Sequence, residues 1–158
     1  MMKRFRFPLE TALRLQKRRL TWVENRLRVA FEAIKRSEEE IGACKASMIR
    51  LAQEFEASAT SGVLPANWDA YPRNAQRIEA EQRSAEDRRV KAEQTFREID
   101  AERKRTVQYC EALLQLRQQA WDAHRAANER SAQLATDEYV LRNWMEPATD
   151  EAAVEIRS

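Results

Sequence analysis

Apolar residues recur at alternating intervals of four and three residues from Leu9 to Phe55. Twelve of the fourteen positions in this series are apolar, and only Gln16 and Ser37 are polar. An average spacing of 3.5 residues keeps one face of a helix turned toward one partner helix over many turns, which is the condition for a coiled coil. Because such a narrow face does not enclose a catalytic pocket, we expect an interaction protein and not an enzyme. The apolar positions are Leu9, Leu13, Leu20, Val23, Leu27, Ala30, Ile34, Ile41, Cys44, Met48, Leu51 and Phe55.

The distribution of glycine and proline predicts a single turn between two long helices. Gly62, Pro65 and Pro72 lie close together, and the segments on either side contain almost no helix-breaking residues. Ala, Glu, Lys, Leu and Arg make up 85 of the 158 residues, a share typical of long helices. We therefore predict an all-α fold, a long two-helix antiparallel coiled-coil hairpin over residues 1–145. Its parts are a helix at 8–57, a turn at 58–72 and a longer helix at 73–145, followed by an acidic flexible tail at 146–158.

The second helix has a less regular apolar face, and its pairing with the first is a separate prediction. The step from Ile99 through Arg103 to Val107 predicts a stutter in the coiled coil. Apolar residues oppose each other best when facing residue numbers add up to about 130. That register places Phe31 opposite Ile99. It also brings the acidic cluster Glu38-Glu39-Glu40 near the basic residues Arg88, Arg89 and Lys91. The predicted face consists of Ala75, Ile78, Ala85, Ala92, Phe96, Ile99, Val107, Cys110, Leu114 and Trp121.

Charge is distributed unevenly, although the formal net charge is only +2. Residues 1–36 carry eleven basic and three acidic side chains, whereas residues 137–158 carry two basic and six acidic ones. A basic end attracts nucleic acid, but this one lacks the interleaved aromatic residues and glycines of a single-strand binder and no basic-region motif is present. We therefore expect no nucleic-acid partner.

Motifs for catalysis and cofactor binding are missing from the sequence. There is no glycine-rich phosphate loop and no metal-ligand spacing of Cys and His, so we expect no catalytic residues, metal, cofactor or small-molecule substrate. The helix pairing in which facing residue numbers add up to about 130 separates Cys44 from Cys110 by about 35 Å along the hairpin. That distance excludes a disulfide between them. The basic segment 1–8 is not followed by an apolar run, which predicts a cytoplasmic protein.

The N-terminal sequence Phe5-Arg-Phe7-Pro-Leu9, with Leu13 one helical turn later, resembles the flagellar export protein FliJ family. The turn region, with Gly62, Ala66-Asn67-Trp68 and Tyr71, is similar to the hairpin of that family, and the resemblance covers most of residues 3–145. The second helix is richer in Arg than the family pattern.

The resemblance implies a cytoplasmic, non-enzymatic component of the flagellar type III export apparatus, peripherally associated with the inner membrane. Family members form an antiparallel coiled coil similar to the gamma stalk of rotary ATPases. They insert into the hexameric export ATPase and contact the export gate membrane protein and export chaperones. Injectisome stalk proteins of virulence secretion systems have the same architecture, so they remain an alternative, as does a free-standing coiled-coil scaffold or chaperone. A peripheral membrane helix over residues 3–28 is disfavoured because the apolar face is too narrow and too long.

Two binding regions follow if the chain is a stalk. The expected ATPase-binding residues are Phe5, Phe7, Leu9, Leu13, Arg14, Lys17, Arg18, Arg19, Tyr139, Leu141, Trp144 and Met145. The expected gate- or chaperone-binding residues are Phe55, Val63, Leu64, Trp68, Tyr71 and Ile78. In the alternative interpretation, Phe5 and Phe7 only fasten the start of the first helix to the second helix, and Trp68 belongs to a small local core at the turn.

Overall fold

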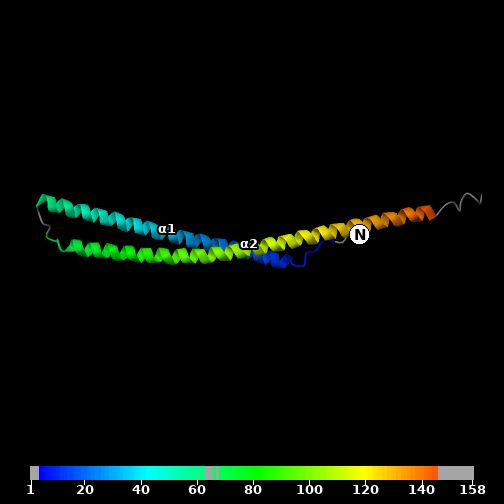
Figure 1. The fold of residues 1–158 in the computed structure, drawn as a ribbon, viewed down its shortest axis with the longest axis horizontal. Coiled ribbons are helices and arrows are strands. Elements are labelled where there is room, and N and C mark those ends of the chain that lie inside the picture. The colour runs from blue at the N-terminus through cyan, green and yellow to red at the C-terminus, as the bar shows by residue number, and fades with distance from the viewer. Residues whose placement is uncertain (1–3, 63–65, 67, 146–158) are drawn as a thin grey trace, which may run out of the picture. The chain divides into compact units, whose positions relative to one another are not determined.

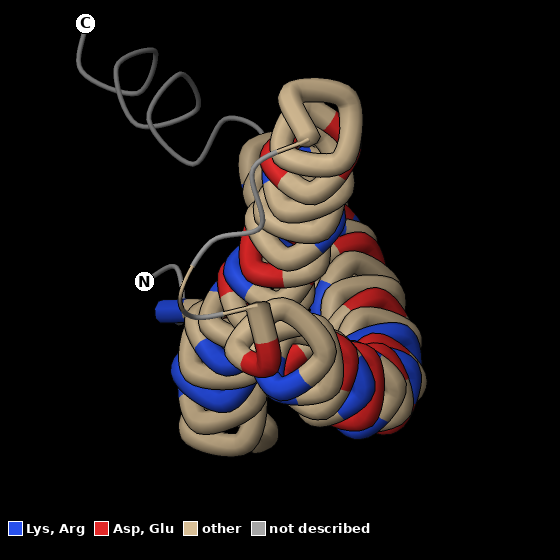
Figure 2. The backbone as a smooth tube through the Cα atoms, turned by 90° about the vertical axis from the view of Figure 1, so that its left-hand side faces the viewer, with Lys and Arg blue, Asp and Glu red and all other residues tan. Residues whose placement is uncertain are grey.

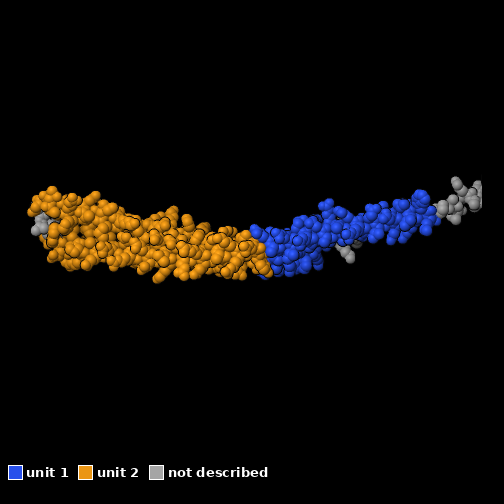
Figure 3. All heavy atoms as spheres, in the orientation of Figure 1, with its two compact units in different colours: residues 1–15, 110–158 blue, residues 16–109 orange. Residues whose placement is uncertain are grey.

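The computed structural model describes residues 4–62, 66 and 68–145, and these form two helices that pack against each other as an antiparallel hairpin (Figure 1). Helix α1 runs over Glu10–Ser61 and helix α2 over Ala70–Met145. The predicted all-α hairpin with a longer second helix is confirmed. The chain divides into two compact units, residues 1–15 with 110–158 and residues 16–109 (Figure 3), and each helix continues from one unit into the other.

Helix α1 starts two residues later and ends four residues later than the sequence predicts. Its first turn follows Pro8, and the backbone N–H of Glu10 donates to the Phe7 carbonyl over 3.2 Å. At the other end, the Thr60 hydroxyl donates to the Glu56 carbonyl over 2.8 Å. This bond gives the hydroxyl a partner within the helix. The helix stops before Gly62, whose φ of 68° is the left-handed conformation common just past helix ends.

Helix α2 starts three residues earlier than predicted, at Ala70. Pro72 lies in its first turn, where a missing backbone N–H breaks no helical hydrogen bond. The N–H of Tyr71 donates to the Trp68 carbonyl over 3.3 Å, which closes the turn in front of the helix. Pro65 and the predicted tail at 146–158 lie outside the described residues.

Within residues 16–109, the predicted apolar face of α1 is the buried face of the helix from Leu20 to Leu51, whereas Phe55 at its end is 41% exposed. Its positions from Leu20 to Leu51 are all buried or half-buried, and Val23 is fully buried. Val23 and Ala30 form a core with Ile99 of α2, and further apolar side chains pack around them. The polar exception Ser37 is also buried, but its hydroxyl donates to the Ala33 carbonyl over 3.0 Å. A satisfied hydroxyl is inexpensive to bury, which explains how the face tolerates it.

The predicted stutter in α2 is wrong, because the buried face keeps its regular spacing. Thr106 is 5% exposed, whereas the adjacent Val107 is only half-buried. In the unit formed by residues 1–15 and 110–158, Leu113 is buried and the predicted Leu114 is 41% exposed. The hydroxyl of Thr106 donates to the Glu102 carbonyl over 2.9 Å, so a polar residue can occupy the buried position.

The pairing of the helices agrees with the predicted register to within one helical turn. Arg88 forms an ion pair with Glu40, one contact between the two charge clusters that the register brings together. Phe31 contacts the Phe96 ring at a centroid distance of 6.4 Å, one turn from the predicted Ile99. Basic and acidic residues are interspersed along the helices (Figure 2). Both thiols, the half-buried Cys44 and the buried Cys110, are free, as predicted.

Candidate partner-binding surfaces

Phe5 packs its ring against α2 within the unit formed by residues 1–15 and 110–158. The ring meets Trp121 edge-on at a centroid distance of 5.1 Å and His124 at 5.4 Å. Aromatic pairs favour this edge-to-face geometry. Phe5 therefore fastens the segment before α1 onto α2, as the alternative interpretation expects.

The other predicted ATPase-binding residues of this N-terminal segment differ in accessibility. Leu13 is 1% exposed and belongs to the core, so its side chain is not available to a partner. Leu9 is 42% exposed, Phe7 is half-buried and Arg14 is exposed. The segment is further held by an ion pair of 3.3 Å between the Glu10 carboxylate and Arg117 of α2.

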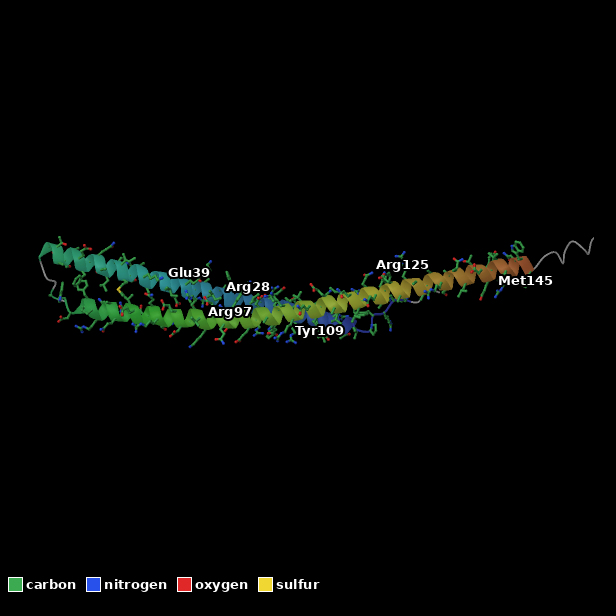
Figure 4. All side chains as sticks on the ribbon, viewed as in Figure 1. Arg28, Glu39, Arg97, Tyr109, Arg125 and Met145 are labelled. Atoms are coloured by element: carbon green, nitrogen blue, oxygen red, sulfur yellow. The ribbon has the colours of Figure 1, made fainter. Side chains whose placement is uncertain are left out.

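Residues 131–145 of α2, called the end segment here, carry six large exposed apolar side chains. Every residue in the end segment is exposed. The side chains of the segment stand out from helix α2, whose last residue, Met145, is labelled in Figure 4. Leu134, Leu141 and Met145 share one face because they are seven and four residues apart. The large apolar side chains are Leu134, Tyr139, Val140, Leu141, Trp144 and Met145, from 48% to 82% exposed.

The end segment contains two apolar residues that the predicted binding set lacks. Leu134 precedes Leu141 by seven residues, and Val140 precedes Trp144 by four. Residues at these helical intervals lie on one side of a helix. These spacings of seven and four residues are the sequence signal that could have added Leu134 and Val140 to the predicted ATPase-binding residues.

The predicted basic residues of α1, apart from Arg14, fall in the unit formed by residues 16–109. Lys17 and Arg18 are exposed, but Arg19 is already paired with Glu102 of α2 over 3.1 Å. Arg26 binds the other oxygen of the same carboxylate over 3.0 Å. The hydrogen bond from Arg19 holds the pKa of Glu102 below its ordinary value; partial burial opposes this shift and Arg26 adds to it. Glu102 is therefore a charged bridge between the helices.

At the turn, three aromatic rings form a local cluster. The ring of Phe55 lies 4.7 Å from Trp68 and 5.7 Å from Tyr71, centroid to centroid. Trp68 and Tyr71 are half-buried and Ile78 is buried, which agrees with the expected local core. Val63 and Leu64, from the same predicted binding set, lie outside the described residues. Next to the cluster is a hollow of about 330 Å³, lined by Met48, Leu51, Ala52, Phe55, Tyr71, Pro72 and Ala75.

A groove around Trp22, called the Trp22 groove here, was not predicted from the sequence. It has a volume of about 490 Å³ and lies between α1 and α2 within residues 16–109. Trp22 and Val29 stand on its α1 rim and are 57% and 61% exposed. Their seven-residue interval outside the coiled-coil face was the available signal. The groove is lined by Trp22, Asn25, Arg26, Arg28, Val29, Ala30, Ala33, Ala92, Thr95 and Ile99.

In the described part of the chain, neither a metal-binding cluster nor a membrane-spanning helix is found. No group of three or more His, Cys, Asp or Glu side chains within residues 4–62, 66 and 68–145 could hold a metal ion. Over the same ranges, neither helix contains an apolar stretch long enough to cross a bilayer.

Comparison with known protein families, functionally characterised proteins and solved structures finds no match to this chain.

Proposed function

We propose that this protein is a non-enzymatic cytoplasmic stalk of the flagellar type III protein export apparatus. In this role it binds the export ATPase ring and couples the ring to the export gate and export chaperones. The observation that carries the proposal is the end segment, fifteen consecutive exposed residues with six large apolar side chains on a single helix. Uncovered apolar surface of this extent is typical of a binding site.

The end segment supplies the type of anchor that a ring interior recognises. Trp144 and Met145 are 81% and 82% exposed, and a tryptophan that enters a pocket commonly dominates binding energy. Lys17 and Arg18 carry exposed positive charge, which accelerates encounter with an acidic surface. Phe5 supports the site indirectly, because its contact with Trp121 holds the start of the chain on α2.

The turn is the proposed contact for the export gate or a chaperone. Phe55 and Tyr71 border the apolar hollow, so a partner side chain can enter it beside two rigid rings. Trp68 stacks on Phe55 and keeps that ring in place. Peripheral association with the inner membrane then follows from binding to the gate protein.

Mixing the protein with the export ATPase from the same organism tests the proposal. We expect faster ATP turnover and more hexamer at micromolar stalk protein. The double variant Trp144→Ala/Met145→Ala should lose at least tenfold in apparent affinity, while Ile49→Ala, a change at an exposed position of α1, should match the wild type. No effect of the wild-type protein on turnover or assembly would remove the proposal. The same assay with an injectisome ATPase separates the flagellar from the virulence system.

A further inference from the structure

The Trp22 groove combines an apolar floor with a positively charged rim. Its floor includes the buried Ala30 and Ile99, which pack in the core between the helices. Arg26 and Arg28 are among its lining residues, whereas no carboxylate lines it; Arg28 is labelled in Figure 4. A groove between two paired helices is where a third helix packs. Its rim selects an apolar helix flanked by acidic residues.

Trp22 is held in position before any partner binds. The guanidinium of Arg26 lies over the indole, 4.5 Å from its centroid, and the same guanidinium is bonded to Glu102. Arg19 bonds to that carboxylate as well. Fixing an exposed aromatic side chain in advance lowers the entropic cost of association. The groove therefore has a preorganised edge.

The end segment has the chemistry that this groove selects. Leu134, Leu141 and Met145 lie on one side of it, and Asp137 and Glu138, three and four residues after Leu134, add acidic side chains to that same side. Fifteen residues of helix extend about 22 Å, and the twelve residues from Trp22 to Ala33 extend about 18 Å. The segment is long enough to cover the groove along its whole length.

We propose that the end segment of one molecule docks as a third helix in the Trp22 groove of a second copy. The end segment and one wall of the groove both belong to helix α2. Docking covers Trp22 and Val29 in one copy. In the other copy it covers the side of the end segment formed by Leu134, Leu141 and Met145, called the leucine face here. The inference does not rest on the export role. If both hold, self-association and ring binding compete for the end segment.

Sedimentation equilibrium of the full-length protein tests this proposal directly. One docked helix buries a small interface, so we expect self-association with a dissociation constant of about 10 µM. Moderate salt should weaken it severalfold, because the acidic residues meet Arg28 at an exposed rim. A protein that remains monomeric at about 200 µM in low salt, twenty times that constant, would overturn the proposal.

Paired variants identify the two surfaces. Val29→Glu in the groove and Leu141→Glu in the end segment should each weaken self-association at least tenfold. Both positions are exposed, so helicity and melting temperature should be unchanged. Ile49→Glu and Thr136→Glu add the same charge at exposed positions outside the groove and off the leucine face, respectively, and should associate like the wild type.

An equal mixture of the two disruptive variants distinguishes this docking from other modes of association. The Val29→Glu copy retains an intact end segment, and the Leu141→Glu copy retains an intact groove. Mixing should therefore restore pairing that neither variant shows alone. A mixture that stays monomeric, or a Val29→Glu variant that associates normally, would refute docking in the groove. Because these measurements use the protein alone, their failure is distinguishable from failure of the ATPase assay.

Discussion

Replacing one buried isoleucine and one exposed isoleucine of the same helix by alanine measures how much the coiled-coil face stabilises the fold. Ile41 is 6% exposed and Ile49 is 59% exposed, and both belong to α1. Each substitution removes three carbons, worth about 0.8 kcal/mol apiece when they leave a buried environment. The cavity left behind adds to this loss. We therefore expect Ile41→Ala to lower the free energy of unfolding by about 3 kcal/mol.

The exposed position provides the control for the buried one. Ile49→Ala removes the same atoms from a largely solvated side chain and should change the free energy of unfolding by less than about 0.5 kcal/mol. Urea unfolding followed by circular dichroism at 222 nm measures both values, and the melting temperature of Ile41→Ala should fall by roughly 6 to 12 °C. Equal stabilities of the two variants would refute the assignment of the buried face.

Two further predictions concern charge and backbone conformation. Because Arg19 and Arg26 lower the folded-state pKa of Glu102, the resulting stabilisation is complete above the unfolded-state pKa and is lost as the pH falls through the folded-state pKa. Thermal melts between pH 6 and pH 3 should show a smaller fall in melting temperature for Glu102→Gln than for the wild type. Equal falls in melting temperature would contradict a stabilising role of the Glu102 carboxylate between the two helices. Gly62→Ala should destabilise by about 1 kcal/mol because its φ is positive, and Gly42→Ala inside α1 should stabilise by about 0.5 to 1 kcal/mol. Neither added methyl group contacts a neighbouring side chain or segment within 4 Å, so the free energies of unfolding measured in urea report the backbone effect alone. If both substitutions changed the free energy of unfolding in the same direction, backbone conformation would not explain the results.

The candidate surfaces could be predicted only in part. Trp144 and Met145 are recognisable from sequence as candidate binding residues because the predicted second helix is longer than the first. Leu13 also looks like an anchor in the sequence, but it is buried. Arg19 looks like a free cation, but it is occupied by Glu102. Residue type and spacing describe one helix at a time, whereas accessibility depends on what the other helix covers.

Local periodicity by itself determined the two helices, the turn near Gly62 and the buried face of α1. The register was also accessible to within one turn, since apolar faces of two helices match well in few alignments. Tertiary structure alone decided between neighbouring candidates on α2, where Thr106 and Leu113 are buried and Val107 and Leu114 are not. At 113 and 114 two apolar residues are adjacent, whereas at 106 a polar threonine takes the buried position beside the apolar Val107. Sequence spacing permits either face, and only contact with α1 selects the one that is buried.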